Sequence, residues 1–200
     1  MRLRNILKIL YLKMKNRLTT TLVQTDIFWE NKQENLRNLE KIFSTLPQTN
    51  LVVLPEMFST GFSMDVKKNA ESMNGLVINW MKAMARQFCT TIVGSVMIEE
   101  NKHIFNRMLF ISPDGEVSFY DKRHLFRMGE ENSHFTPGNK RTIVTYHGWR
   151  CNLMVCYDLR FPVWSRNKND YDLLVYCANW PESRREVWLK LLLARAIENQ

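Results

Sequence analysis

The sequence predicts an α/β fold with mixed β-sheets, and three observations carry this prediction. In the first half, apolar strand-like segments alternate with segments of helical periodicity, as in strand–helix–strand units. In the middle, strand-like segments follow one another with short turns between them, which indicates paired strands. The chain has 200 residues, 45% of them hydrophobic, enough to bury one substantial core.

The first hundred residues contain three predicted strands and two predicted helices. The strands are predicted over residues 19–28, 51–54 and 90–100 because these segments are apolar and rich in β-branched side chains. The second of them is wholly apolar and stops at Pro55, which is consistent with burial on both faces. The helices are predicted over residues 30–46 and 74–88, where apolar side chains recur every three or four positions.

The second hundred residues continue with five predicted strands and a helix. The strands are predicted over residues 103–112, 116–122, 141–146, 151–156 and 171–180, and Pro113-Asp114-Gly115 is a turn between the first two. The helix begins at Glu182, and we expect one of its faces to consist of Val187, Trp188, Leu191, Leu192 and Arg195. It reaches Gln200 without a C-cap signal, so we expect a chain that is incomplete at its C-terminus.

The net charge of +8 does not indicate nucleic-acid binding, because most of it lies in one short segment. Residues 1–18 carry six basic side chains and no acidic one, which leaves a net charge of only +2 for the rest. This segment is a poor signal peptide, since Lys8 interrupts its apolar region and no cleavage site follows. A basic helix on a membrane surface remains an alternative, but a non-native extension is favoured.

The cysteines and histidines predict neither a disulfide framework nor a metal site. Cys89, Cys151, Cys156 and Cys177 form no CxxC pair, and each lies in or beside an apolar stretch. Free cysteines in such places are typical of a reducing compartment, so we expect a cytoplasmic protein. We expect no cofactor and no bound metal.

Three reactive side chains follow predicted strands, and together they predict a catalytic site. Cys156 ends an apolar strand just before a polar turn, where a bend would free the Tyr157 N–H for an oxyanion. Glu56 stands two residues beyond a buried strand, and Lys122 stands just past another. Each alone could be structural: a packed thiol, a solvated carboxylate or a surface lysine. Together they suit a cysteine hydrolase in which Glu56 moves the proton and Lys122 balances the negative charge.

The segments around these residues resemble the three motifs of the nitrilase superfamily of carbon–nitrogen hydrolases. They read LPEMFSTGF, YDKRHLFRMGEENSHFTPG and VCYDLRFPVWSRN, and the similarity extends from about Thr20 to Gln200. The bacterial omega-amidase (2-oxoglutaramate amidase) branch is the most similar. The resemblance implies an αββα sandwich, a Glu56–Lys122–Cys156 triad and a thioester intermediate. It also implies a supporting role for Glu131, an oxyanion donor in the Tyr157 N–H, and a homodimer.

The resemblance divides the chain into a basic extension, residues 1–18, and a hydrolase domain, residues 19–200, that is incomplete at its C-terminus. Substrates of omega-amidases carry a neutral terminal amide and an anionic α-keto acid end. A pocket for them needs apolar walls and a cation. Phe62 and Trp180 are candidate walls, and Arg184 or its neighbour Arg185 is a candidate cation. We expect Arg160 to pair with Asp158 or another acid rather than with substrate, and His124 to support its loop.

Three alternatives remain open at this point. Another branch of the superfamily, such as a carbamoylase, a true nitrilase or a general aliphatic amidase, would use the same three residues. A Cys–His hydrolase would instead require one of the scattered histidines beside Cys156. The chain could also be a catalytically silent fragment or a membrane-surface module that depends on its basic N-terminus.

Overall fold

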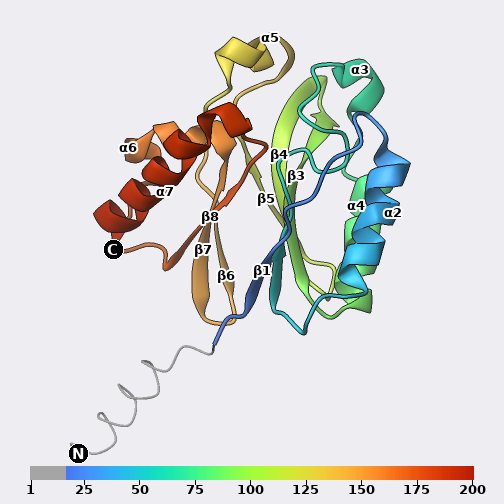
Figure 1. Cartoon of the computed structure of the whole chain (residues 1–200), viewed down its shortest axis with the longest axis horizontal. Coiled ribbons are helices and arrows are strands. Elements are labelled where there is room, and N and C mark those ends of the chain that lie inside the picture. The colour runs from blue at the N-terminus through green and yellow to red at the C-terminus, as the bar shows by residue number, and fades with distance from the viewer. Residues whose placement is uncertain (1–16) are drawn as a thin grey trace, which may run out of the picture.

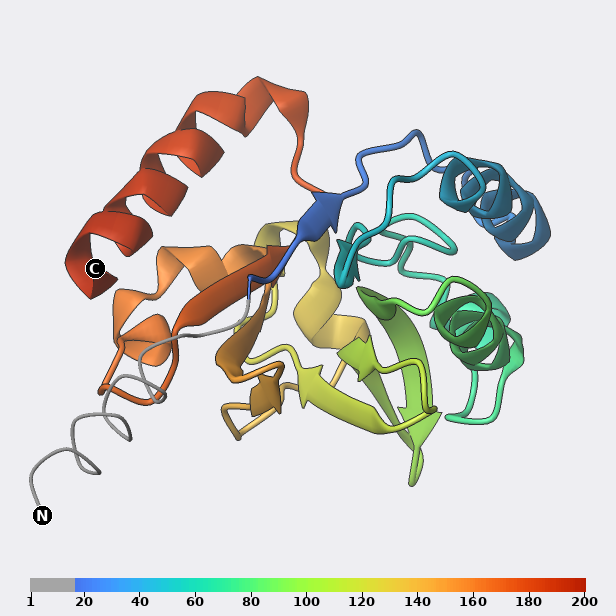
Figure 2. The ribbon, with the colours of Figure 1, turned by 90° about the horizontal axis from the view of Figure 1, so that it is seen from below.

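Two β-sheets lie face to face at the centre of the computed structural model, which describes residues 17–200 (Figure 1). Helices cover the outer face of each sheet, so four layers follow one another as helix, sheet, sheet and helix (Figures 1 and 2). The expected α/β fold with mixed sheets is therefore confirmed. Two sheets that each bury an inner face need helices to cover the apolar outer face as well.

The first sheet has five strands in the order β1-β2-β3-β4-β5. They are β1 (Thr20–Leu22), β2 (Leu51–Val53), β3 (Thr91–Glu100), β4 (His103–Ile111) and β5 (Val117–Asp121). The first three are parallel, and the last two add antiparallel neighbours through short turns. Because β2 lies between β1 and β3 and is buried at every position, the chain is still in the protein interior where this strand ends.

The second sheet has three strands in the order β6-β7-β8, namely β6 (Ile143–Tyr146), β7 (Trp149–Val155) and β8 (Leu173–Cys177). Strands β6 and β7 form an antiparallel hairpin through the turn at Gly148, whereas β8 runs parallel to β7. The carboxyl ends of β7 and β8 consequently lie side by side, which is where ligands gather in parallel sheets.

Apolar side chains fill both the space between the sheets and the space under the helices. Helices α2 (Lys32–Phe43) and α4 (Leu76–Gln87) pack on the first sheet through residues such as Leu39 and Ile78. Between the sheets, Val53 and Phe110 meet Leu153, Val155 and their neighbours. The remaining helices are α3 (Val66–Asn69), α5 (Glu131–His134), α6 (Pro162–Ser165) and α7 (Arg185–Asn199), with 3-10 turns η1 (Arg127–Gly129), η2 (Cys156–Arg160) and η3 (Glu182–Arg184).

Three sequence expectations need correction. The strand expected over residues 19–28 pairs only at Thr20–Leu22, because its neighbour β2 is three residues long and runs into Pro55, which has no N–H. The helix expected from Glu182 begins with the turn η3, and α7 starts at Arg185. Of the expected helix face, Val187 is exposed, whereas the guanidinium of Arg195 is buried and donates to the Leu159 carbonyl at 3.1 Å.

The four cysteines are free and differ in burial. Cys151, Cys156 and Cys177 are buried, but Cys89 is exposed at the end of α4. The expectations for residues 1–18 fall almost entirely outside the described residues. Among residues 17–200, no helix is both long enough and apolar enough to cross a membrane.

Candidate active site

Glu56 reaches the interior because it follows the buried strand β2, with only Leu54 and Pro55 between. Its side chain is fully buried, and the turn that follows is held by Met57, whose backbone N–H donates to Ser95 Oγ at 3.0 Å. The two carboxylate oxygens have different partners: Oε1 accepts from Lys122 Nζ at 2.8 Å, and Oε2 accepts from the Asn179 backbone N–H at 3.0 Å. Acceptor atoms buried this deeply need hydrogen-bond donors, and the structure supplies them to both oxygens.

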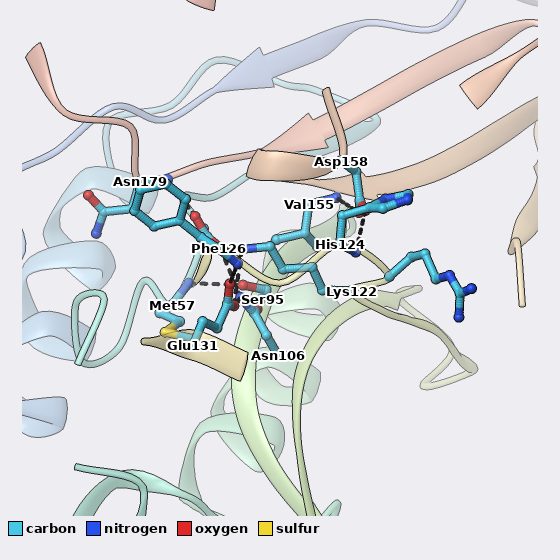
Figure 3. Close-up of polar contacts among 12 residues, drawn as sticks. Met57, Ser95, Asn106, Lys122, His124, Phe126, Glu131, Val155, Asp158 and Asn179 are labelled. Atoms are coloured by element: carbon cyan, nitrogen blue, oxygen red, sulfur yellow. Dashed lines mark hydrogen bonds and ion pairs between the residues drawn. The ribbon is translucent and has the colours of Figure 1, made fainter. Parts of the chain in front are cut away.

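Lys122 is the first residue after β5, and its ammonium lies between two carboxylates, of which that of Glu131 is labelled in Figure 3. Nζ is 2.8 Å from Glu56 Oε1 and 2.8 Å from Glu131 Oε2, and none of the three side chains is exposed. Burial alone would lower the pKa of Lys122, but the charges of Glu56 and Glu131 outweigh it and hold the pKa above its usual value. The residue is therefore a permanent cation.

Glu131 opens the short helix α5 and is fully buried, whereas its neighbour Glu130 is exposed with a left-handed backbone (φ 59°). Oε2 of Glu131 accepts from Lys122 and from the Phe126 backbone N–H at 2.6 Å. Burial raises the pKa of Glu131 although the charge of Lys122 opposes the shift. The structure thus brings Glu131, and not Glu130, to the ammonium of Lys122.

Cys156 stands where β7 turns into η2, with a left-handed backbone (φ 43°) that is unusual for a residue with a Cβ. The sharp turn expected from the sequence is present at this position. Burial first, and then the charge of Glu56, raise the pKa of the Cys156 thiol, while Lys122 opposes the shift. The charges of Glu56 and Lys122 both act on this sulfur, and Lys122 and Asn179 line the same cavity as Cys156. The resting sulfur is therefore a neutral thiol beside a proton acceptor.

Asp158 fastens this turn to the segment that carries Lys122. It is fully buried and accepts from Tyr120 Oη at 2.8 Å, His124 N at 2.9 Å, His124 Nδ1 at 2.7 Å and Val155 N at 3.0 Å. The His124 ring also stacks on Phe161 at 3.7 Å between centroids, so it supports its loop. These bonds hold the ends of β5 and β7 at a fixed distance.

The expectation that Arg160 pairs with an acid is wrong. The 3-10 turn rotates Asp158 inward, toward Tyr120 and His124, and leaves Arg160 exposed with no carboxylate partner within residues 17–200. Its guanidinium instead lies 5.4 Å from the Trp180 ring. The sequence shows an arginine between apolar residues, but it does not show whether this turn directs the Arg160 side chain inward or outward.

A small cavity of about 60 Å³ opens above Cys156. Its walls include the expected Phe62, Trp180 and Arg184 together with Tyr157 and Lys122. Four lining residues were not predicted from the sequence: Phe126, Arg160, Asn179 and Pro181. Arg185 points elsewhere, because it lines a different cavity and pairs with Glu182 at 3.6 Å.

Asn106 was also missed, although the sequence contained a signal for it. It interrupts the apolar strand β4, is fully buried, and its Nδ2 donates to Glu56 Oε1 and Glu131 Oε1, at 2.9 Å in both cases (Figure 3). A lone amide inside an apolar strand usually has a specific partner, because an unpaired buried amide is costly.

The arrangement combines a thiol, a carboxylate able to accept its proton, and a fixed cation beside both. These are the parts needed for attack on a carbonyl carbon followed by proton return to a leaving group. No group of three or more metal-binding side chains occurs among residues 17–200.

Comparison with known proteins supports the resemblance seen in the motifs. The sequence model of the carbon-nitrogen hydrolase family matches residues 19–200. The omega-amidase YafV of Escherichia coli (strain K12) is 48% identical over 183 residues, which cover 92% of this chain and 71% of that protein. The 2-oxoglutaramate amidase of Bacillus subtilis is 31% identical over 188 residues, which cover 91% of this chain and 73% of that protein.

A solved structure supports the fold. The crystal structure of a CN-hydrolase superfamily protein from Xanthomonas campestris, which has an arsenic adduct in its active site, superposes with a TM-score of 0.89. The two proteins are 41% identical, and the match covers 92% of this chain and 73% of the other. The αββα arrangement of layers is therefore the one found in this superfamily.

Proposed function

The chain belongs to the carbon-nitrogen hydrolase family as an amidase of the nitrilase superfamily, and from this premise we propose that it hydrolyses the terminal amide of a small dicarboxylic-type substrate such as 2-oxoglutaramate. One observation carries the proposal: the carboxylate of Glu56 pairs with the ammonium of Lys122 at 2.8 Å, and the charges of both act on the thiol of Cys156 beneath a small cavity. The names of the two amidase relatives supply the candidate substrate.

In the proposed reaction, Glu56 accepts the thiol proton as the sulfur of Cys156 attacks the amide carbon. Lys122 and the Tyr157 backbone N–H stabilise the oxyanion that forms. Glu56 then returns the proton to the nitrogen, the carbon–nitrogen bond breaks, and ammonia leaves a thioester on Cys156. Water, deprotonated by Glu56, attacks the thioester and releases the carboxylate product and the thiol. Glu131 holds Lys122 in place during both steps and assists the departure of ammonia.

The charges around the cavity favour a substrate with an anionic end. Arg184 lies 5.0 Å from the Phe126 ring, Arg160 lies 5.4 Å from the Trp180 ring, and neither has a carboxylate partner in the described part of the chain. Two unpaired guanidinium groups beside aromatic walls suit the carboxylate of an α-keto acid, which Arg184 binds in this proposal. Phe62 and Trp180 enclose the apolar carbon chain between carboxylate and amide.

The homodimer and the cytoplasmic location expected from the sequence stay part of this proposal. Neither depends on the geometry of the cavity. Sedimentation of the purified protein tests the first, and fractionation of cells tests the second.

The test compares ammonia release from 2-oxoglutaramate, a nitrile and an N-carbamoyl amino acid, so that the branches of the superfamily are separated. Mass spectrometry after trapping with substrate then locates the adduct. Trypsin releases residues 151–160 as one peptide that contains both Cys151 and Cys156, so fragment ions must place the acyl group. We expect it on Cys156, with no adduct in Cys156→Ala and full labelling in Cys177→Ala. Turnover without an adduct at Cys156 would refute the proposal.

A further inference from the structure

We propose that Asn106 is a positioning residue that fixes the orientation of Glu56 and Glu131 by acting as an uncharged counterpart of Lys122. This inference rests on the proposed function, because it assigns a task to a residue beneath the reacting groups. It adds a fifth side chain to the Glu56, Lys122, Cys156 and Glu131 set.

The geometry is a closed ring of four groups, three of which, Asn106, Lys122 and Glu131, are labelled in Figure 3. Nδ2 of Asn106 donates at 2.9 Å to Oε1 of Glu56 and at 2.9 Å to Oε1 of Glu131. Nζ of Lys122 donates to the same two oxygens, at 2.8 Å and 3.0 Å. Two nitrogen donors therefore alternate with two carboxylate oxygens, and each carboxylate is held from both sides.

The chemistry of the position requires an amide. A primary amide nitrogen carries two hydrogens and can donate to two acceptors, whereas a hydroxyl has only one hydrogen to donate. A second cation would lower the basicity that Glu56 needs as a proton acceptor, and a carboxylate would add a third negative charge. Asparagine is the side chain that donates twice from this strand without changing the charge of the cluster.

A second observation concerns the oxygen of the Asn106 amide. Oδ1 of Asn106 is buried and has no hydrogen-bond partner within residues 17–200. All the side-chain hydrogen bonds that Asn106 makes in the described part of the chain therefore come from Nδ2. Nδ2 donates two hydrogen bonds, one to each carboxylate.

The ring also gives the two oxygens of Glu56 different roles: one is held in the ring, and the other is free of it. Oε1 is held by Asn106 and Lys122, while Oε2 accepts the Asn179 N–H. Oε2 is therefore the oxygen left to receive the thiol proton. Without Asn106, the carboxylate of Glu56 could rotate about its terminal bond, and the acceptor would no longer be fixed toward the sulfur.

The test measures kcat, KM and the pH dependence of kcat/KM for Asn106→Leu and Asn106→Asp. The titratable groups that face the ring are Glu56, Glu131, Lys122, Cys156 and Cys177. Loss of a donor disfavours ionised carboxylates. In Asn106→Leu we therefore expect the acid limb of the kcat/KM profile, where activity rises with pH, to move to higher pH by about one unit. We expect kcat to fall about 10- to 100-fold, with KM changed less than about threefold. Asn106→Asp keeps the shape, adds a negative charge, and should move the acid limb further.

Asn152→Leu is the matched control. Asn152 is also a fully buried asparagine on a strand, and neither of its side-chain polar atoms has a partner in the described part of the chain. It is not in the ring, so we expect its acid limb to be unchanged.

A second readout does not depend on turnover. The rate at which iodoacetamide alkylates Cys156 is measured against pH in the full chain. We expect its pH dependence to shift in both Asn106 variants and to stay unchanged in Asn152→Leu. If Asn106→Leu does not fold, the isosteric Asn106→Asp carries the test.

An acid limb and an alkylation profile that coincide with those of the unsubstituted chain would overturn the inference. If no amide is hydrolysed at all, the proposed function fails, but the alkylation profile still decides the role of Asn106.

Discussion

Glu56 and Lys122, 66 residues apart in the sequence, form an ion pair of 2.8 Å in which neither side chain is exposed. Glu131 adds a second carboxylate at 2.8 Å from the same ammonium, so the single cation serves two acids. Removing three charges from water is unfavourable unless each finds several partners. The cluster is thus a place where folding and reactivity depend on the same contacts.

Replacing Lys122 by methionine should destabilise the fold as well as abolish turnover. It leaves Glu56 and Glu131 as neighbouring buried carboxylates without their cation, which costs about 3–5 kcal/mol. The loss should be largest at neutral pH and should shrink on acidification, because protonation removes the repulsion. Urea unfolding at several pH values measures this, with the exposed Lys41→Met of α2 as control. A loss below about 1 kcal/mol would show that the pair contributes little.

Replacing Asp158 by asparagine should loosen the turn that carries Cys156. The substitution keeps the shape but places an NH₂ group against the donors Tyr120, His124 and Val155. We expect a loss of about 2 kcal/mol in the free energy of unfolding and a fall in kcat. The exposed Asp26→Asn should change stability by less than about 0.5 kcal/mol. Unchanged kcat in Asp158→Asn would mean that the turn keeps its shape without these bonds.

Stability should fall at alkaline pH because several acidic groups stay neutral in the folded chain. Burial is the largest cause that raises the pKa of the Cys156 and Cys177 thiols and of the Tyr120 and Tyr176 phenols. Unfolded thiols ionise near pH 9.0 and unfolded phenols near 10.0, so above these values unfolding releases protons. The stabilisation is complete below that range and is lost as pH rises through it.

Urea unfolding at about pH 7.5 and about pH 10.5 measures this alkaline loss. Cys177→Ala removes one of the four groups. The slope of stability against pH should then decrease by about 1.4 kcal/mol per pH unit above the thiol range. Identical slopes for the two proteins would contradict the prediction.

Replacing Arg184 by methionine should weaken binding of anionic substrates selectively. We expect KM for 2-oxoglutaramate to rise at least about 10-fold, while kcat/KM for a neutral amide of the same length stays within about threefold. Arg185→Met is the matched control, since Arg185 is the next residue, pairs with Glu182 at 3.6 Å and lines another cavity. If Arg184→Met changed the kinetic constants equally for anionic and neutral amides, Arg184 would not be the residue that binds the substrate carboxylate.

Much of the site could be predicted because its residues follow strands whose ends are visible in the sequence. An apolar run that stops at Pro55 places Glu56 at a strand end, and the run before Cys156 does the same. Asn106 could not be assigned in this way, because its partners come from residues 50 and 25 positions away along the chain. Arg160 was misjudged because the direction of its side chain depends on a 3-10 turn held by tertiary hydrogen bonds.

The thiol and its charged partners come from opposite layers of the sandwich: Cys156 follows β7, whereas Glu56, Asn106 and Lys122 belong to the other sheet or to the segments just beyond its strands. If the two sheets had not closed on each other, the Cys156 thiol would lie apart from its proton acceptor, and no amide would be hydrolysed. The rate of turnover therefore depends on the distance between the two sheets. An increase of about 1 Å would interrupt proton transfer from Cys156 to Glu56 while both sheets were still folded.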